Sequence, residues 1–178
     1  MAKFSTPHYD ADPKAIETIK GIRTVFYPRA FNITWGNDNR YWRFPQNINL
    51  KDPKSVVQLL QVSWLEVTCS TDNVEVGKTY KVGFNLSLQP DAFGWNEVEV
   101  FIMAKVGKKG NYIFKKTKLG NKPTNTTKFC FPEEGLEIKV VAPPSSPGDS
   151  RLYFGLYEVW SGKWKGGLQI HNAFVHKI

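Results

Sequence analysis

The segment YKVGFNLSL, residues 80–88, decides the fold class of this chain. Its apolar residues occupy every second position from Tyr80 to Leu88, and lysine, glycine, asparagine and serine fill the positions between them. A strict period of two places alternate side chains on opposite faces of a strand, one in a core and one toward water. The segment therefore predicts a β-strand that covers a hydrophobic core with one face.

Similar short runs, rich in valine, aromatic residues and threonine, lie on both sides of this segment. They cover residues 62–68, 98–102, 112–116, 128–131, 136–141, 152–160 and 168–175. Turn signals separate them, with glycine or proline at 76–78, 107–111, 120–123 and 143–148. Many short strands with frequent turns indicate an all-β protein, and we predict an antiparallel β-sandwich of the jelly-roll type.

Residues 1–30 do not follow this pattern and are interpreted as a short N-terminal arm. Asp12 and Pro13 can start a short helix that runs through Ile16 and Ile19 and ends at Gly21. At 178 residues the chain has the length of one domain. We therefore expect an arm over residues 1–30 and a single binding domain over residues 31–178.

The first residues contain no apolar stretch typical of a secretory signal, and no run approaches the roughly 20 apolar residues of a membrane helix. These patterns predict an intracellular protein without membrane insertion. In a reducing compartment Cys69 and Cys130 are expected to be free thiols within strands. The three histidines show no ligand spacing with them, so we expect neither a metal nor another cofactor.

The segment FNITWGNDNRYWRF, residues 31–44, is the most informative for function. It places Trp35, Tyr41 and Trp42 around the polar loop 36–39. Aromatic rings that cannot all be buried, next to amide and carboxylate groups, suit a ligand with apolar faces and polar edges. Pyranose sugars and nucleic-acid bases are such ligands. Because the segment has no nucleophile–base pair and no metal-ligand spacing, it predicts binding and not catalysis.

The other tryptophans differ in what their positions indicate. Trp95 lies in a loop between two strong strands, where a ring has less packing to do and is well placed for a ligand. Trp64 lies within a strand pattern, which favours a place in the core. Trp160 and Trp164 flank a tight turn, and one of them can simply cover the end of the core.

The charge distribution supports an alternative function from a different class. Lysine and arginine total 24 against 16 acidic residues, a net charge of +8. Both a solvated hairpin face and a polyanion-binding patch fit this excess. The alternative is an RNA-binding carrier protein that uses the lysine-rich patch at residues 105–128. Eight lysines and no acidic residue lie between residues 100 and 132, at Lys105, Lys108, Lys109, Lys115, Lys116, Lys118, Lys122 and Lys128.

Several motifs together resemble the Nictaba-related phloem lectins of plants, of the phloem protein 2 type, and the match is close to the cucurbit members. They occur in the order of that family and span residues 31–178, nearly the whole expected domain. The motifs are ITWGND at 33–38, RYW at 40–42, LQVSWLEV at 60–67, YKVGF at 80–84, FGW at 93–95, LYE at 156–158 and WKGGL at 164–168.

The resemblance implies a jelly-roll homodimer that binds N-acetylglucosamine, chito-oligosaccharides and glycoproteins, including the N-glycan core. It also implies a location in cytoplasm, nucleus or phloem sap, and a role in defence, stress or phloem transport. Carbohydrate binding in the family is attributed to two tryptophans that match Trp35 and Trp42, and to an acid that matches Glu158. A second family acid corresponds to Arg151 here.

The resulting hypothesis is a non-catalytic lectin. Trp42 and Trp95 are expected to stack on the sugar ring, while Asn37, Asn39 and Glu158 bond its hydroxyls or acetamide. Trp35 either forms part of the same wall or braces it from behind.

Overall fold

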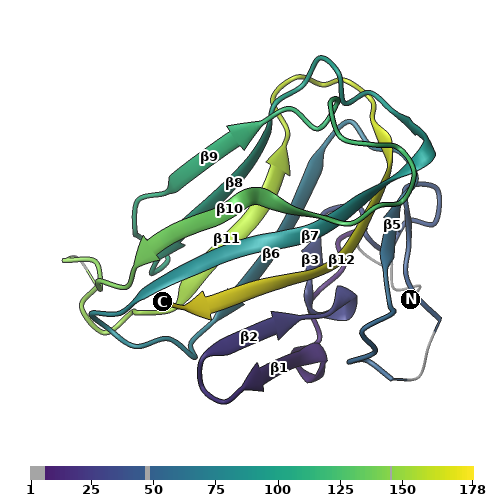
Figure 1. Ribbon diagram of the computed structural model, residues 1–178. Coiled ribbons are helices and arrows are strands. Elements are labelled where there is room, and N and C mark those ends of the chain that lie inside the picture. Colours follow the sequence, from purple (N-terminus) through teal and green to yellow (C-terminus); the bar gives the residue numbers. More distant parts are fainter. Residues whose placement is uncertain (1–6, 47–48, 145) are drawn as a thin grey trace, which may run out of the picture.

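The structure is a sandwich of two antiparallel β-sheets (Figure 1). It is a computed structural model that describes residues 7–46, 49–144 and 146–178. From residue 57 onward, successive strands alternate between the two sheets, except for one hairpin at residues 100–117 whose two strands lie in the same sheet. The arrangement confirms the predicted antiparallel β-sandwich of jelly-roll type.

The first sheet has seven strands and is built around β12, Gly166–Lys177. One edge of β12 pairs with β7, Thr79–Phe93, and β7 pairs in turn with β10, Phe129–Lys139. The other edge of β12 pairs with two shorter hairpin strands at different heights. These are β2, Arg23–Phe26, joined to β1, Ile16–Ile19, and β5, Val57–Leu59, joined to β4, Trp42–Arg43.

The second sheet has five strands in the order β3-β6-β11-β8-β9. Their bounds are Asn32–Ile33 for β3, Leu65–Thr71 for β6, Leu152–Glu158 for β11, Val100–Val106 for β8 and Ile113–Thr117 for β9. In β6 and β8 every second residue is buried, as a strand with one core face requires. The residues between them form the outer face of this sheet.

Aromatic side chains from both sheets meet in the core. The ring of Phe154 on β11 lies 5.5 Å from that of Phe26 on β2 and 5.6 Å from that of Phe84 on β7. All three side chains are almost fully buried. Phe84 belongs to the segment 80–88, whose even-numbered residues do face the core as the alternation predicts.

The N-terminal region contains strand where a helix was predicted. The Asp12 side chain does accept a hydrogen bond from the Lys14 backbone, but the helical turn over Pro13–Ala15 is a single turn of 3-10 helix. A second 3-10 turn, Pro28–Ala30, follows β2. From Ile16 the chain forms β1, because it pairs with the open edge of β2. Gly21, which was predicted to end a helix, lies in the turn between β1 and β2 instead. Since β2 pairs with β12, residues 23–26 belong to the seven-stranded sheet. The division of the chain into an arm over residues 1–30 and a binding domain from residue 31 stays a prediction.

Both cysteines are free, as predicted, and lie within strands. Burial raises the pKa of the Cys69 thiol well above its usual value; burial also raises that of Cys130, against the opposing charge of Arg23. Within the described ranges, no helix has the length and apolar character to cross a membrane. In the same part of the chain, no group of three or more histidine, cysteine or acidic residues is placed to hold a metal ion.

Replacement of Phe154 by alanine should lower the free energy of unfolding by about 3–5 kcal/mol, because it empties the space between two sheets. Urea denaturation measures this loss. Phe114→Ala on β9 is the matched control, since that ring is 55% exposed and its loss should cost less than about 1 kcal/mol. Equal losses in the two variants would contradict the assigned core.

Candidate functional site

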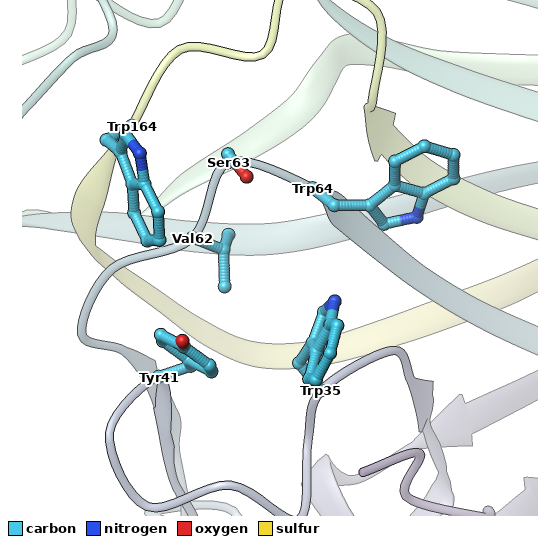
Figure 2. Close-up of a pocket in the computed structure, with 6 residues that line it drawn as sticks. All are labelled: Trp35, Tyr41, Val62, Ser63, Trp64 and Trp164. Atoms are coloured by element: carbon cyan, nitrogen blue, oxygen red, sulfur yellow. The ribbon is translucent and has the colours of Figure 1, made fainter.

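Four aromatic side chains surround a hollow of about 110 Å³ at one edge of the sandwich. Trp35, Tyr41, Trp64 and Trp164 line it together with Val62 and Ser63, and we call it the aromatic pocket. The residues come from the β3–β4 loop, the segment between β5 and β6, and the segment before β12. Figure 2 shows the rings of Trp35, Tyr41 and Trp164 around Val62, with the Trp64 ring turned to one side.

The rings are close enough to form one apolar surface but remain open to solvent. The Tyr41 ring centre lies 6.0 Å from that of Trp35 and 6.1 Å from that of Trp164. Trp35, Trp64 and Trp164 are 40%, 44% and 51% exposed. Clustered exposed aromatic side chains on a folded domain are typical of a binding site. Sequence reasoning found Trp35 but missed Trp64 and Trp164, whose strand and turn positions favoured packing roles.

The backbone of the β3–β4 loop directs Trp35 outward. Trp35 has a φ of 66°, a conformation that L-residues with bulky side chains rarely adopt. Gly36 follows it at a place where a Cβ would lie 2.7 Å from the Cβ of Tyr9. The Asp38 carbonyl then accepts hydrogen bonds from the backbones of Tyr41 and Trp42, at 3.0 and 3.1 Å. Such local strain persists only where the surroundings impose it, and here it accompanies an exposed ring.

The structure contradicts the predicted stacking of Trp42 on a ligand. Trp42 is 1% exposed, because β4 pairs it with Leu59 of β5 and turns its ring into the core. Its Nε1 is buried with no hydrogen-bond partner in the described part of the chain. Of the two tryptophans in the segment 31–44, Trp35 is therefore exposed at the aromatic pocket and Trp42 is buried in the core.

Trp95 is likewise buried, contrary to the prediction that it contacts a ligand. It is 3% exposed, and its Nε1 donates a 2.9 Å hydrogen bond to the Gly166 carbonyl. The preceding Gly94 lies so close to the 164–165 backbone that a Cβ would come within 2.3 Å of the Trp164 carbonyl oxygen. Trp95 thus supports the segment that carries Trp164 without reaching the aromatic pocket.

Glu158 is also internal, and it forms a buried ion pair. Its Oε1 lies 2.8 Å from Nζ of Lys165, and the two side chains are 3% and 0% exposed. Lys165 Nζ also donates to the carbonyls of Ser63 at 2.8 Å and Lys163 at 3.1 Å, and the Ser161 hydroxyl donates to Glu158. Burial raises the pKa of Glu158, but the hydrogen bonds from Lys165 and Ser161 outweigh it and hold the pKa below its usual value. A carboxylate engaged in this way is not available to sugar hydroxyls, so the predicted direct contact is wrong.

Asn37 and Asn39 are separated from the aromatic pocket. They line a different hollow of about 550 Å³, together with Arg29, Trp42 and Arg43. The side-chain amide of Asn37 donates a 2.8 Å hydrogen bond to the His8 carbonyl. The structure therefore does not bring these amides together with Trp35 around one ligand position.

Comparisons with known proteins give a consistent family relationship. A family model described as phloem protein 2 matches residues 22–176. Phloem protein 2-like A9 of Arabidopsis thaliana is 40% identical over 190 residues, which cover 100% of both chains. A lectin of Luffa acutangula is 32% identical over 73 residues, covering 40% of this chain and 35% of the lectin. Among solved structures, the xylan-binding domain CBM22-1 of Paenibacillus barcinonensis Xyn10C aligns with a TM-score of 0.44 and 10% identity, over 79% of this chain and 87% of that domain.

Lys165→Met should lower the free energy of unfolding by about 3–5 kcal/mol, because it leaves the Glu158 carboxylate buried without its counter-ion. The double variant Lys165→Met with Glu158→Gln contains no unpaired charge and should lose less than the single variant. Guanidinium denaturation of four proteins, wild type, Lys165→Met, Glu158→Gln and the double variant, measures both effects. If the double variant loses as much as the two single changes added together, the pair is not coupled as the geometry implies.

Proposed function

The chain belongs to the phloem protein 2 family, and from this relationship we propose that it is a non-catalytic lectin for N-acetylglucosamine and its chito-oligosaccharides. The aromatic pocket is the proposed binding site. The observation that carries the proposal is the exposure of Trp35, Trp64 and Trp164 around one hollow. Trp64 and Trp164 are chain neighbours of Ser63 and Lys165, whose backbone positions the buried Lys165–Glu158 ion pair helps to fix.

The size and shape of the pocket suit one saccharide unit. A hollow of about 110 Å³ holds part of one sugar unit and leaves the rest of an oligosaccharide outside, where the exposed tryptophan rings offer further apolar contact surface. Pyranose rings present C–H faces that pack on indole rings, and each such contact is weak because water is displaced from both partners. Several units in a row should therefore bind better than a monosaccharide.

The chemistry of the lining favours an uncharged, acetylated sugar. None of the six residues that line the pocket carries a charge, and the nearby Lys165 and Glu158 form an ion pair with each other. The buried Val62 supplies an apolar floor for an acetamide methyl, while the Ser63 hydroxyl and the indole N–H groups supply polar contacts. A protonated amino sugar would lose water there without gaining a counter-ion.

Catalysis has little support at this site. Glycoside hydrolysis requires two carboxyl groups that flank the scissile bond, and the pocket lining contains none. A contact between Ser87 Oγ and His171 Nε2, at 2.7 Å, resembles a nucleophile–base pair. Ser87 is fully buried, however, and its hydroxyl also bonds Gln169 Oε1 at 2.9 Å, so a substrate has no access to it. Incubation with chitin oligomers should release no new reducing ends.

The wider setting follows from the family and is part of the same proposal. The ligands in the plant would be glycoproteins and N-acetylglucosamine oligosaccharides, including the N-glycan core. We propose a homodimer in phloem sap, cytoplasm or nucleus, with a role in defence, stress or phloem transport.

The RNA-binding alternative gains no specific support from the lysine positions. Lys105 and Lys108 line one hollow, whereas Lys115, Lys116 and Lys122 line another that also contains Glu133. Lys116 Nζ further pairs with Glu99 at 3.0 Å. A single-stranded nucleic acid requires a continuous basic groove with stacking rings, and the charge here is divided. Binding to RNA that falls steeply with salt would revive this alternative.

Titration calorimetry with chitotriose tests the lectin proposal. Trp164→Ala should weaken binding about tenfold or more, a loss of about 1.4 kcal/mol, because it removes one wall of the pocket. Trp160→Ala is the matched control, since Trp160 is 58% exposed but does not line the pocket. Unchanged affinity in the Trp164 variant would reject the site, and equal affinity for cellotriose would reject the acetamide preference.

Stability should decrease as the pH falls from about 6.5 to about 4, in part because of His171. Burial, with a smaller contribution from Lys128, lowers its pKa to about 4. The unfolded chain, with an ordinary histidine pKa near 6.5, takes up the proton first, so this contribution is complete above pH 6.5 and is lost through pH 4. Thermal unfolding of wild type and His171→Gln between these pH values measures the effect. Identical pH slopes in the two proteins would contradict the assigned titration.

A further inference from the structure

A second hollow, of about 280 Å³, lies on the outer face of the five-stranded sheet. Its principal walls are Thr68 and Ser70 of β6, Tyr153 and Tyr157 of β11, Lys105 of β8, and Tyr112 before β9. We call it the tyrosine trough. It shares no lining residue with the aromatic pocket and has more than twice its volume.

The register of the strands explains how the trough forms. Tyr153 pairs with Ser70 on one side and Lys105 on the other, so the three side chains form one row across the sheet. Gly155 lies between Tyr153 and Tyr157 on the same face of β11. A Cβ at Gly155 would lie 2.8 Å from Cε2 of Tyr157, which means that the Tyr157 ring lies over the glycine. Because Gly155 has no side chain, the Tyr157 ring can lie over the strand and form a flat aromatic floor.

Hydroxyl groups surround this floor. Thr68, Ser70, Tyr112, Tyr153 and Tyr157 each contribute one, and a hydroxyl both donates and accepts hydrogen bonds. The Ser70 oxygen already accepts from Arg151, at 3.0 and 3.1 Å, so its hydroxyl serves a ligand as a donor. Burial, together with the neighbouring Tyr112, raises the pKa of Tyr157, so its phenol remains protonated. A flat ring with a rim of neutral hydroxyls matches the apolar face and polar edge of a pyranose.

The charge of the trough has one sign. Lys105 Nζ lies 4.7 Å from the centre of the Tyr112 ring and 5.8 Å from that of Tyr153, and Lys108 is exposed beside it. Lys105 donates one hydrogen bond, at 2.8 Å, to the Lys108 carbonyl, which leaves two of its three donors for a ligand. No aspartate or glutamate lines the trough.

The acidic groups nearby have other partners. Glu66 accepts a 3.0 Å hydrogen bond from the Thr34 hydroxyl, and Asp149 accepts one of 2.9 Å from the Lys108 backbone. Both carboxylates keep their charge, but neither lines the trough, so a negatively charged group that reaches Lys105 can make a favourable charge-assisted contact with its ammonium group. An uncharged sugar would leave this donor capacity unused.

We propose that the tyrosine trough is a second carbohydrate site, specific for saccharides that carry a carboxylate, such as oligomers of a hexuronic acid. The sugar ring packs on Tyr153 and Tyr157, its hydroxyls bond Thr68 and Ser70, and its carboxylate reaches Lys105. Nucleic acid is the poorer match, because two ammonium groups cannot follow a phosphate backbone over several nucleotides. The site is independent of the neutral ligand proposed for the aromatic pocket.

Titration calorimetry with a trimer of galacturonic acid tests this assignment, with the neutral galactose trimer as reference. The acidic trimer should bind about tenfold or more tightly than the neutral one, and Lys105→Met should remove most of that difference while it keeps the aliphatic stem over the rings. Lys81→Met on the opposite sheet is the matched control, since Lys81 is also a half-buried lysine on a strand. Tyr153→Ala should weaken both trimers.

Equal binding of the acidic trimer by wild type and Lys105→Met would overturn the proposal. So would a uridine oligonucleotide that shifts the amide resonances of Thr68 and Ser70 when the acidic trimer does not. Chitotriose titration of Lys105→Met separates the two sites, because its affinity should be unchanged. If wild type binds the acidic trimer but not chitotriose, the proposal for the aromatic pocket fails and the proposal for the trough stands.

Discussion

The Nζ group of Lys165 holds together two of the three segments that carry the aromatic pocket, those of Trp64 and Trp164. This buried ammonium has a carboxylate and two backbone carbonyls as acceptors, from Glu158, Ser63 and Lys163. A charge removed from water costs several kcal/mol unless its partners are in place. Any arrangement that displaces one of these segments therefore leaves a buried charge or carbonyl unsatisfied. Trp64 follows Ser63, and Trp164 lies next to Lys165, so both rings leave the backbone at fixed points.

The tryptophans divide into supports and contact surfaces. Trp42 and Trp95 are buried and pack beneath the loops that form the aromatic pocket, whereas Trp35 and Trp164 are exposed at its surface. Exposure of large rings costs hydrophobic free energy, but rings held in position lose little freedom when a ligand arrives. This division explains why rings on three separate segments can act as one surface.

The two candidate sites differ in charge for a structural reason. In the aromatic pocket the lysine and the glutamate neutralise each other beneath the lining, so the surface presented to a ligand is neutral. No acid lines the tyrosine trough, and the ammonium group of Lys105 lies beside its floor without a carboxylate partner among the lining residues. The net charge of the chain does not reveal this difference, because it depends on which charged groups become partners after folding.

Alternation along segments such as 80–88 was sufficient to predict the antiparallel sandwich, because the period of two dictates which side chains must share a core. The aromatic residues around a polar loop selected the segment 31–44 as a candidate functional segment, and Trp35 of that segment does line the aromatic pocket. Sequence reasoning assigned the wrong roles to Trp42, Trp95 and Glu158, since a residue type near a loop does not say which way its side chain points. At the N-terminus, a glycine such as Gly21 can either end a helix or form the turn of a hairpin, and the sequence does not distinguish the two. Pairing with the open edge of β2 made it the turn of a hairpin.

The sequence by itself determined the fold class and the aromatic character of the candidate site, because these depend on local composition and spacing. Only the tertiary structure decided which aromatic rings meet. Trp35, Tyr41, Trp64 and Trp164 are brought together by pairing between β12 and β5 and by the contact of Lys165 with Ser63, over 102 residues of chain. Such contacts follow from the global packing of two sheets, which no single segment encodes.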